Sequence, residues 1–203
     1  MRTISITQAL VELKTLDRRI RKAENHEFVF AAKNTDKDSE AIKELRKRAK
    51  ASYQSARDLM RERENIKAAI VSSNAKTKVT IAGEQMTVAE AIEKKTSIDY
   101  EQMLLSSLKA QLASIDHHVT AHNKSVDEKI DRLLETLVGA DKEASAEEQK
   151  ATADLYRERN GIYKEDPIGI QDEIDALEKY IADFLAEVDV ALSISNAKTM
   201  IKL

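Results

Sequence analysis

The chain has 203 residues, of which 42% are hydrophobic and 34% are charged, and its formal net charge is -3. Four glycines, one proline and 4% aromatic residues disfavour sandwiches, barrels and α/β folds, which need turn residues and β-branched strands. The absence of cysteine excludes disulfides and thiolate sites, and the acidic balance argues against a dedicated nucleic-acid-binding protein. The sequence contains no apolar run that could span a membrane and no signal-peptide pattern, so we expect a cytoplasmic protein.

Two internal echoes indicate that the chain is a duplicated unit. The string Ser-Asn-Ala-Lys-Thr occurs at 73–77 and again at 195–199. Upstream of each copy, Ile6–Leu10 matches Val88–Ile92 at a constant offset of 82. Self-similarity of this kind dictates an architecture rather than an activity. The predicted division is a single domain, 1–203, with repeat one at 4–81, repeat two at 86–203 and an insertion in the second repeat at about 140–169.

The first half of the chain predicts two helices. A heptad seam of apolar residues, spaced by three and four, predicts the first helix over about 6–32. Ser39 suits the N-cap of a second helix over about 39–72, in which the same spacing continues. Basic residues concentrate over Lys43–Arg63. We interpret them as the solvated face of the second helix, with phosphate binding as the alternative.

Between the second and third helices the pattern changes to the alternation of a strand. Lys78–Ile81 alternates with period two and a Gly83-containing turn follows, which predicts a short strand or hairpin near 77–87. The segment 199–203 has the same alternation. We therefore expect these two extended segments to pair with each other at one end of a helical bundle.

The second half predicts two further helices separated by an irregular segment. Thr87 and Glu90 form a capping-box pattern that opens a helix of nearly fifty residues, and Gly139 is expected to end it. Residues 140–169 are irregular, with a possible short helix through Tyr156. The last helix is expected over about 168–195.

These elements predict an all-α protein: an elongated antiparallel four-helix bundle or coiled coil, made of two duplicated helical hairpins with short strands near 77–87 and 199–203. Helices of about 30 to 50 residues would be about 45 to 75 Å long. Their unequal lengths would leave part of the third helix's seam uncovered. Because an uncovered apolar seam usually finds another chain, we expect a homo-oligomer.

The order of motifs resembles the septicolysin-like family of small helical bacterial and phage proteins. The matching elements are Asn74-x-x-Thr77, the Gly83 turn followed by Thr87–Ile92, and the closing Asn196-x-x-Thr199. The resemblance implies a helical, oligomeric protein of unsettled biochemical role. It also implies association with a phage or another mobile element, and hence a place in the host cytoplasm.

Three histidines are the nearest approach to a metal site. His118 and His122 are four residues apart, so both could face one direction and hold zinc with a third ligand such as Asp116. We favour a structural interpretation, because His122 occupies a seam position between Val119 and Val126, where a polar residue often fixes register. A pH-sensitive contact is the third interpretation. We therefore predict no metal site and no cofactor.

Two further groups of residues suit an anion. Arg63 sits in the seam of the second helix, where it either pairs with a carboxylate or lines an anion pocket. Tyr156, Arg157 and Arg159 could stack on a base and clamp a phosphate, or could belong to a charged loop that packs its tyrosines onto the bundle.

The duplicated pentapeptide has two interpretations as well. Asn74 and Asn196 could end their helices in the left-handed conformation, while Lys76 and Lys198 favour the negative end of the helix dipole. Alternatively, both copies could surround a shared anion. The two interpretations differ in whether the copies meet in space.

The sequence contains none of the common catalytic signatures: it has no Gly-rich phosphate loop, nucleophile elbow or His-Glu-x-x-His. We therefore predict a non-enzymatic, self-associating protein that binds a protein partner or a small anionic ligand; a phage protein could sequester a host signalling nucleotide in this way. A structural assembly protein of the virion or connector type is the alternative. Membrane activity is disfavoured, because strong charge on every helix leaves no apolar face wide enough to insert.

Overall fold

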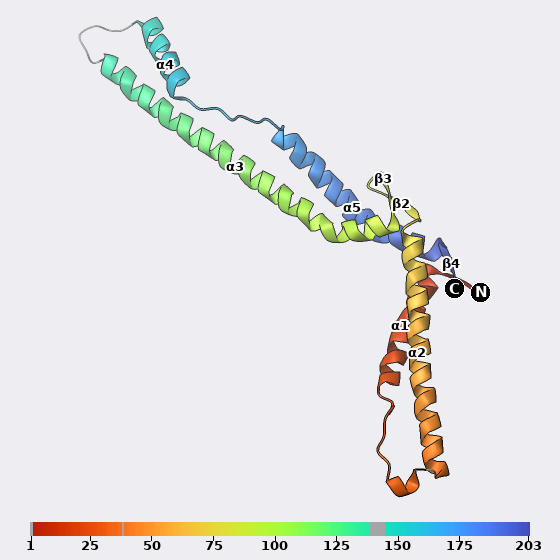
Figure 1. Ribbon diagram of the computed structural model, residues 1–203. Helices are drawn as coiled ribbons and strands as arrows, with labels where there is room; N and C mark the ends of the chain where they lie inside the picture. The colour runs from red at the N-terminus through yellow and green to blue at the C-terminus, as the bar shows by residue number, and fades with distance from the viewer. Residues whose placement is uncertain (1, 38, 139–144) are drawn as a thin grey trace. The chain divides into compact units, whose positions relative to one another are not determined.

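The computed structural model describes residues 2–37, 39–138 and 145–203. Most of these residues lie in helices, which confirms the predicted all-α class with short strands (Figure 1). Gly139, the expected end of the third helix, lies outside the described residues, as do residues 140–144 of the predicted insertion. The elements in chain order are β1 Thr3–Ser5, α1 Ile6–Glu24, a 3-10 turn Asn34–Asp36, α2 Glu40–Asn74, β2 Lys78–Ile81, β3 Glu84–Thr87, α3 Val88–Val138, α4 Ala146–Asn160, α5 Ile170–Lys198 and β4 Met200–Lys202.

The contacts within the chain divide it into two compact units. The first unit is Met1–Thr96 with Asp183–Leu203, and it contains α1, α2, the strands, the start of α3 and the end of α5. The second unit is Ser97–Ala182, with α4 and the remaining parts of α3 and α5. The expectation of a single domain over 1–203 stays a prediction.

In the first unit, α1 and α2 pack along their predicted seams. Ser5 and Gln8 form a capping box at the start of α1, and the hydroxyl of Ser39 accepts a hydrogen bond from the Ile42 amide at 3.3 Å. Both caps satisfy amides that a helix start leaves without partners. The buried side chains of this core are Ile6, Ala9, Leu13, Leu16, Ile20 and Ala23 on α1, Ala56, Leu59, Ile66 and Ile70 on α2, and Ile201 on β4.

The first helix is shorter than predicted, ending at Glu24 rather than near residue 32. The side-chain amide of Asn25 donates to the carbonyl of Arg21 at 3.2 Å, closing the last turn. Beyond this point Phe28 lies outside the helix and packs edge-on against Tyr53, with ring centroids 5.8 Å apart. Phe28 therefore packs against α2 from the connection that follows α1, and not from α1 itself.

The hairpin predicted near 77–87 is confirmed. β2 pairs with β3 in antiparallel register, and the two residues between them, Ala82 and Gly83, both have positive φ, 51° and 77°. Positive φ at both positions is the requirement of the tight turn that matches the twist of antiparallel strands. Ala82 is the only non-glycine residue with positive φ in the described ranges.

The predicted pairing between the two extended segments is wrong. β4 pairs with β1, which lies directly before α1, and Ile201 is opposite Ile4 (Figure 1). Ile201 is buried in the core of α1 and α2, so pairing with β1 places its side chain against that core. An alternating pattern predicts a strand but does not specify the partner of that strand.

The two strand pairs are equivalent under the internal repeat. Ile4 opposite Ile201 corresponds to Met86 opposite Val79. The Ile6 amide donates to the carbonyl of Thr199 at 3.0 Å, and the equivalent Val88 amide donates to Thr77 at 2.8 Å. The first strand of each repeat therefore pairs with the last strand of the other.

The repeated pentapeptide does mark where α2 and α5 end, but not by left-handed asparagines. Asn74 is the last residue of α2, Ala75 after it has φ -70°, and Asn196 lies inside α5. Instead, the amides of Thr77 and Thr199 each donate to the carbonyl of the serine that opens the pentapeptide, both at 2.9 Å. The helix therefore ends through backbone hydrogen bonds at both copies.

The equivalence predicts that the chain tolerates a circular permutation. Arg2 and Leu203 exchange two backbone hydrogen bonds, of 3.0 and 2.9 Å, at the positions that Glu84 and Ile81 occupy beside the Ala82–Gly83 turn. We expect a permutant with Leu203 joined to Arg2 through Asn-Gly, and opened between Ala82 and Gly83, to keep its helical circular dichroism and a melting temperature within a few degrees of the parent.

A control permutant opened between Met60 and Arg61, inside α2, should unfold at a much lower temperature, because it interrupts a helix in the core. Equal melting temperatures for both permutants would contradict the proposed equivalence.

Candidate functional site

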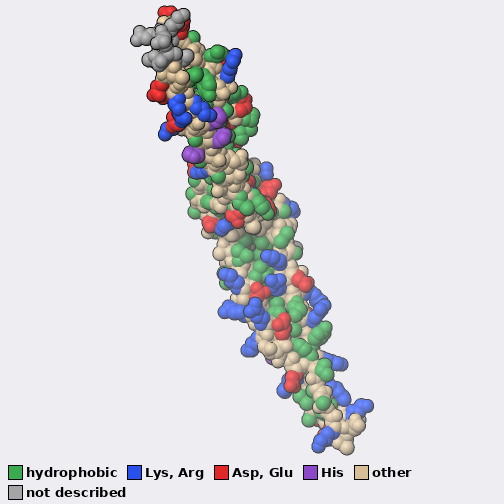
Figure 2. All heavy atoms as spheres, turned by 90° about the vertical axis from the view of Figure 1, so that its left-hand side faces the viewer, with side chains coloured by type: hydrophobic (Ala, Val, Ile, Leu, Met, Phe, Trp, Pro, Cys, Tyr) green, Lys and Arg blue, Asp and Glu red, His purple; other side chains and the backbone are tan. Residues whose placement is uncertain are grey.

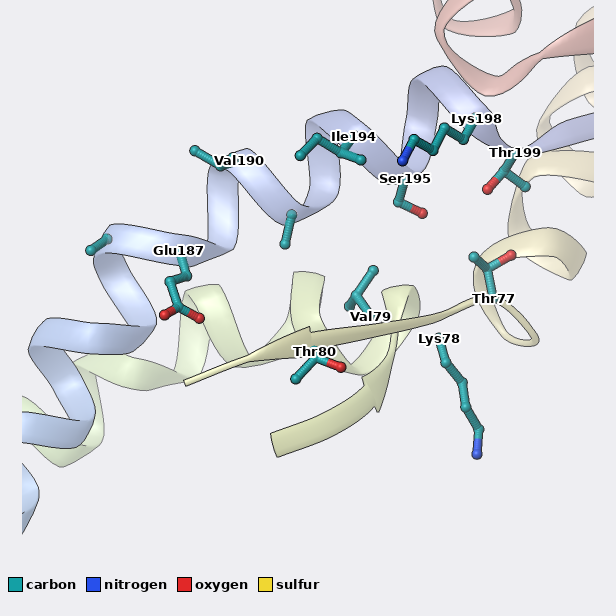
Figure 3. Close-up of a pocket in the computed structure, with 12 residues that line it drawn as sticks. Thr77, Lys78, Val79, Thr80, Glu187, Val190, Ile194, Ser195, Lys198 and Thr199 are labelled. Carbon is teal, nitrogen blue, oxygen red and sulfur yellow. The ribbon is translucent and has the colours of Figure 1, made fainter. Parts of the chain in front are cut away.

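A groove between α5 and β2 in the first unit could hold a ligand, and we call it the α5–β2 groove. Its volume is about 620 Å³. Ala186, Val190 and Ile194 form its apolar wall on α5, and β2 forms the other wall (Figure 3). The side chain of Val79 points toward α5, whereas that of Lys78 points away from it. The groove is therefore apolar along its length and polar at its ends.

Parts of both pentapeptides meet in this groove. Thr77 from the first copy and Ser195, Lys198 and Thr199 from the second line the same end of it (Figure 3). The backbone bonds that tie Thr77 and Thr199 to the starts of α3 and α1 hold the two threonines there. An ammonium beside three hydroxyls suits an anionic group.

The other predicted residues of the pentapeptides lie elsewhere. Asn196 lines a separate groove with Thr7 and Asp189, Asn74 is half-buried at the end of α2, and Lys76 is exposed. Of the four residues predicted as a shared anion site, the structure therefore brings only Lys198 to the α5–β2 groove.

The two charged side chains at the ends of the groove differ in whether they have a partner. At the end opposite Lys198, the carboxylate of Glu187 accepts a hydrogen bond from the Ala82 amide at 2.7 Å. Lys198 has no carboxylate within 4.0 Å among the residues that the structure places. Its ammonium is thus available to a ligand without first breaking an ion pair.

Arg63 is committed to an ion pair. Its Nε donates to Oδ1 of Asp17 at 2.6 Å, and both side chains remain about two-fifths exposed, at 41% and 43%. Glu24 and Glu64 line the same shallow surface groove. Acidic neighbours oppose the binding of an anion, so the geometry fits the interpretation of Arg63 as the partner of a carboxylate.

In the second unit, Tyr156, Arg157 and Arg159 all belong to α4. The guanidinium of Arg157 donates to Asp127 on α3 at 2.9 Å, and Tyr156 packs against the buried cluster of Val126, Ile130 and Ala153. Arg159 is exposed in the last turn of the helix. Two of the three side chains thus attach α4 to α3. This geometry fits the interpretation of packing onto the bundle better than that of a clamp for a phosphate.

His117, His118 and His122 on α3 are exposed, and histidine side chains gather in one region of the surface in Figure 2. His122 was expected in the seam, but it is exposed. The seam passes through the half-buried Asn123, between Val119 and Val126. A spacing of four and then three fits a seam as well as three and then four does, which is why the sequence pattern selected the wrong residue. The Nε2 of His122 lies 2.8 Å from the carbonyl of Asn160.

His118 and His122 have ring centroids 6.4 Å apart. Within the described ranges, no third histidine, aspartate or glutamate joins them in a group that could hold a metal ion. The contact of the His122 imidazole with Asn160, the last residue of α4, instead attaches the end of α4 to α3.

Asn123 is the polar contact that the sequence reasoning missed. Its Nδ2 donates to the carbonyl of Ile162 at 2.8 Å, and its Oδ1 accepts from the amide of the same residue at 3.0 Å. Gly161 directly precedes Ile162, and a Cβ there would lie 2.7 Å from the carbonyl oxygen of Arg157, so the end of α4 requires glycine at this position. The Asn160-Gly161 pair was the one signal in the sequence for this close contact.

A clear pKa shift belongs to a helix cap. The pKa of Glu90 is lowered because its carboxylate accepts hydrogen bonds from the backbone amide and the hydroxyl of Thr87. Across the residues that the structure describes, no polar or charged side chain is buried.

Comparison of the chain with protein-family models, with curated proteins and with solved structures gives no match. The resemblance to the septicolysin-like family therefore stays a prediction that rests on the motifs quoted above. In the helices that the structure describes, no segment is both long and apolar enough to cross a bilayer.

We predict that Asn123→Ala destabilises the second unit by about 1–3 kcal/mol, because it leaves the amide and the carbonyl of Ile162 without partners. Chemical denaturation would measure this change, and limited proteolysis should show faster cleavage within 161–169. Thr120→Ala, an exposed change on the same helix, is the control. Equal losses in the two variants would show that the contact is not specific.

Proposed function

We propose that this chain is a non-catalytic, self-associating helical protein that binds a small anionic ligand. The observation that carries the proposal is a set of large apolar side chains left in solvent on one face of α3. Tyr100, Met103 and Leu104 are 73%, 64% and 53% exposed, and their spacing of three and four residues places them on one stripe. Exposed apolar patches of this kind mark interaction sites.

The seam of the second unit supports the same proposal. Leu105, Leu108 and Leu112 of α3 are only half-buried, although they occupy seam positions. Two antiparallel helices cover each other along a single stripe, so a hairpin without a further layer leaves the flanks of its seam in water. A second copy would supply that layer.

The ligand part of the proposal rests on Lys198. Arg63 and Arg157 are already neutralised by Asp17 and Asp127, whereas Lys198 faces the hydroxyls of the α5–β2 groove without an ion-pair partner in the described ranges. A phosphate or carboxylate there would gain a charge-assisted hydrogen bond. If the chain is phage-encoded, as its resemblance implies, sequestration of a host signalling nucleotide in the host cytoplasm would fit this site.

The alternative is an assembly protein of the virion or connector type that binds no ligand. The exposed stripe on α3 favours this alternative as much as it favours a discrete oligomer, because packing of helices is all that either requires. The two candidates differ in their products: a discrete oligomer with a ligand, or an open-ended polymer without one.

Sedimentation velocity and native mass spectrometry of the purified chain test the proposal. We expect a discrete oligomer, and Met103→Glu together with Leu104→Glu should weaken it, because two carboxylates would then be buried at the α3 stripe. A panel of nucleotides should raise the melting temperature, since a ligand at 100 times its Kd stabilises by about 2.7 kcal/mol.

Lys198→Ala should remove the ligand-induced rise, while Lys76→Ala, the equivalent change in the first pentapeptide, should leave it intact. A monomer at every concentration would reject self-association. An oligomer that no nucleotide stabilises would reject the ligand, and a polymer would establish the assembly alternative.

A further inference from the structure

The helix α5 carries a second apolar stripe that its own core does not use. Phe184 and Val188 are buried in the first unit. Val190 and Ile194, on the neighbouring stripe, are 59% and 49% exposed and form the wall of the α5–β2 groove (Figure 3). Removing large aliphatic side chains from water is favourable, so this stripe favours a partner.

The internal repeat shows that the fold itself does not require this stripe. Ile66 on α2 and Val188 on α5 are equivalent positions, related as Ser73 is to Ser195, and both are buried. At the positions equivalent to Val190 and Ile194, however, α2 has Ala68 and Ser72. The same helix–strand packing is thus made with small or polar residues in one repeat and with aliphatic ones in the other.

The strand beside the stripe has an unpaired edge. Within the described part of the chain β2 pairs with β3 alone. The carbonyl of Thr77 accepts the bond from Val88, so by the alternation of an antiparallel ladder the amides and carbonyls of Lys78 and Thr80 point away from β3. An open edge of this kind is a template for another strand.

We propose that a second copy of this chain docks here, its β2 antiparallel to the first β2 and its α5 stripe against the first α5 stripe. The two elements are adjacent, so one two-fold contact covers both at once. Charge supports a two-fold partner: Lys198 lies at one end of the groove and Glu187 at the other, so antiparallel docking brings each cation to the other copy's carboxylate. This contact and an anionic ligand at Lys198 therefore exclude each other. This inference rests on the proposed self-association and adds a contact surface in the first unit to the α3 stripe of the second.

Sedimentation velocity of the full chain gives the first test. We expect Val190→Glu with Ile194→Glu to raise the dimer dissociation constant at least tenfold, because two carboxylates would be buried against the partner's stripe. The matched control is Ala68→Glu with Ser72→Glu on α2, which should dissociate as the parent does. Circular dichroism should show that both variants remain folded.

Crosslinking gives a second test that does not depend on destabilising the interface. The chain has no cysteine, so Thr80→Cys carries a single thiol on the open edge, and Lys202→Cys carries one at the equivalent position of β4. A short bis-maleimide should link two copies of Thr80→Cys and should not link Lys202→Cys.

The outcomes separate the two proposals. A parent that associates, with a Val190→Glu/Ile194→Glu variant that associates equally well and Thr80→Cys chains that do not link, would overturn this interface while leaving self-association intact. A parent that stays monomeric would overturn both. Linking of both cysteine variants alike would also reject the β2 edge as the specific contact.

Discussion

The exchange of strands between the two repeats is the interaction on which the first unit depends. β4 closes on β1 and β2 closes on β3, with the same register in both pairs, so neither repeat makes its strand pair by itself. Pairs of three or four residues are too short to be stable alone. They are held because Ile201 is buried in the core of α1 and α2, and because Ile81 is buried as well. The same exchange carries Thr77 and Thr199 to one end of the α5–β2 groove, so the candidate site is a product of the duplication.

The charges of the molecule follow from its helical geometry. Long helices place nearly every ionisable side chain at the surface, where oppositely charged neighbours pair across adjacent helices, as Arg63 does with Asp17 and Arg157 with Asp127. Exposed pairs of this kind contribute little stability, on the order of 0–1 kcal/mol, but they remove cations from the set that could bind an anion. Lys198 remains because it lies where α5 gives way to β4, beyond the reach of the carboxylates described. The candidate anion site therefore lies at an end of a helix rather than on a helix face.

The parts of the fold that are local in sequence could be predicted, and those that depend on choosing a partner could not. The caps and the hairpin turn depend only on contacts between residues at most four apart in the sequence. They lie where the pattern predicted them, at Ser39, at Thr87 with Glu90, and at Ala82–Gly83. The partner of β4 depends on β1, three residues that look like the start of a helix until they are aligned with β3. The prediction that His122 lies in the seam of α3 was wrong, because His122 and the adjacent Asn123 fit the 3/4 spacing almost equally well. Only the contact with Ile162 selects Asn123. In the candidate site, Lys198 was predicted, whereas Val190 and Ile194 were not, because they lie beside the buried stripe of Phe184 and Val188 rather than on it.

Because the chain contains two copies of one unit, residues that the fold requires can be distinguished from residues that serve another purpose. Where both copies keep the same chemistry, as at Ser5 and Thr87 or at Ile66 and Val188, the shared architecture is sufficient explanation. Where they differ, the architecture cannot be the cause, because it tolerates both choices. The second copy has the longer α3, the added α4 and the aliphatic stripe of α5, and it leaves more apolar surface in water at those places. Since that exposure lowers solubility and adds nothing to the hairpin core, its presence in one copy is best explained by an interaction that only that copy makes.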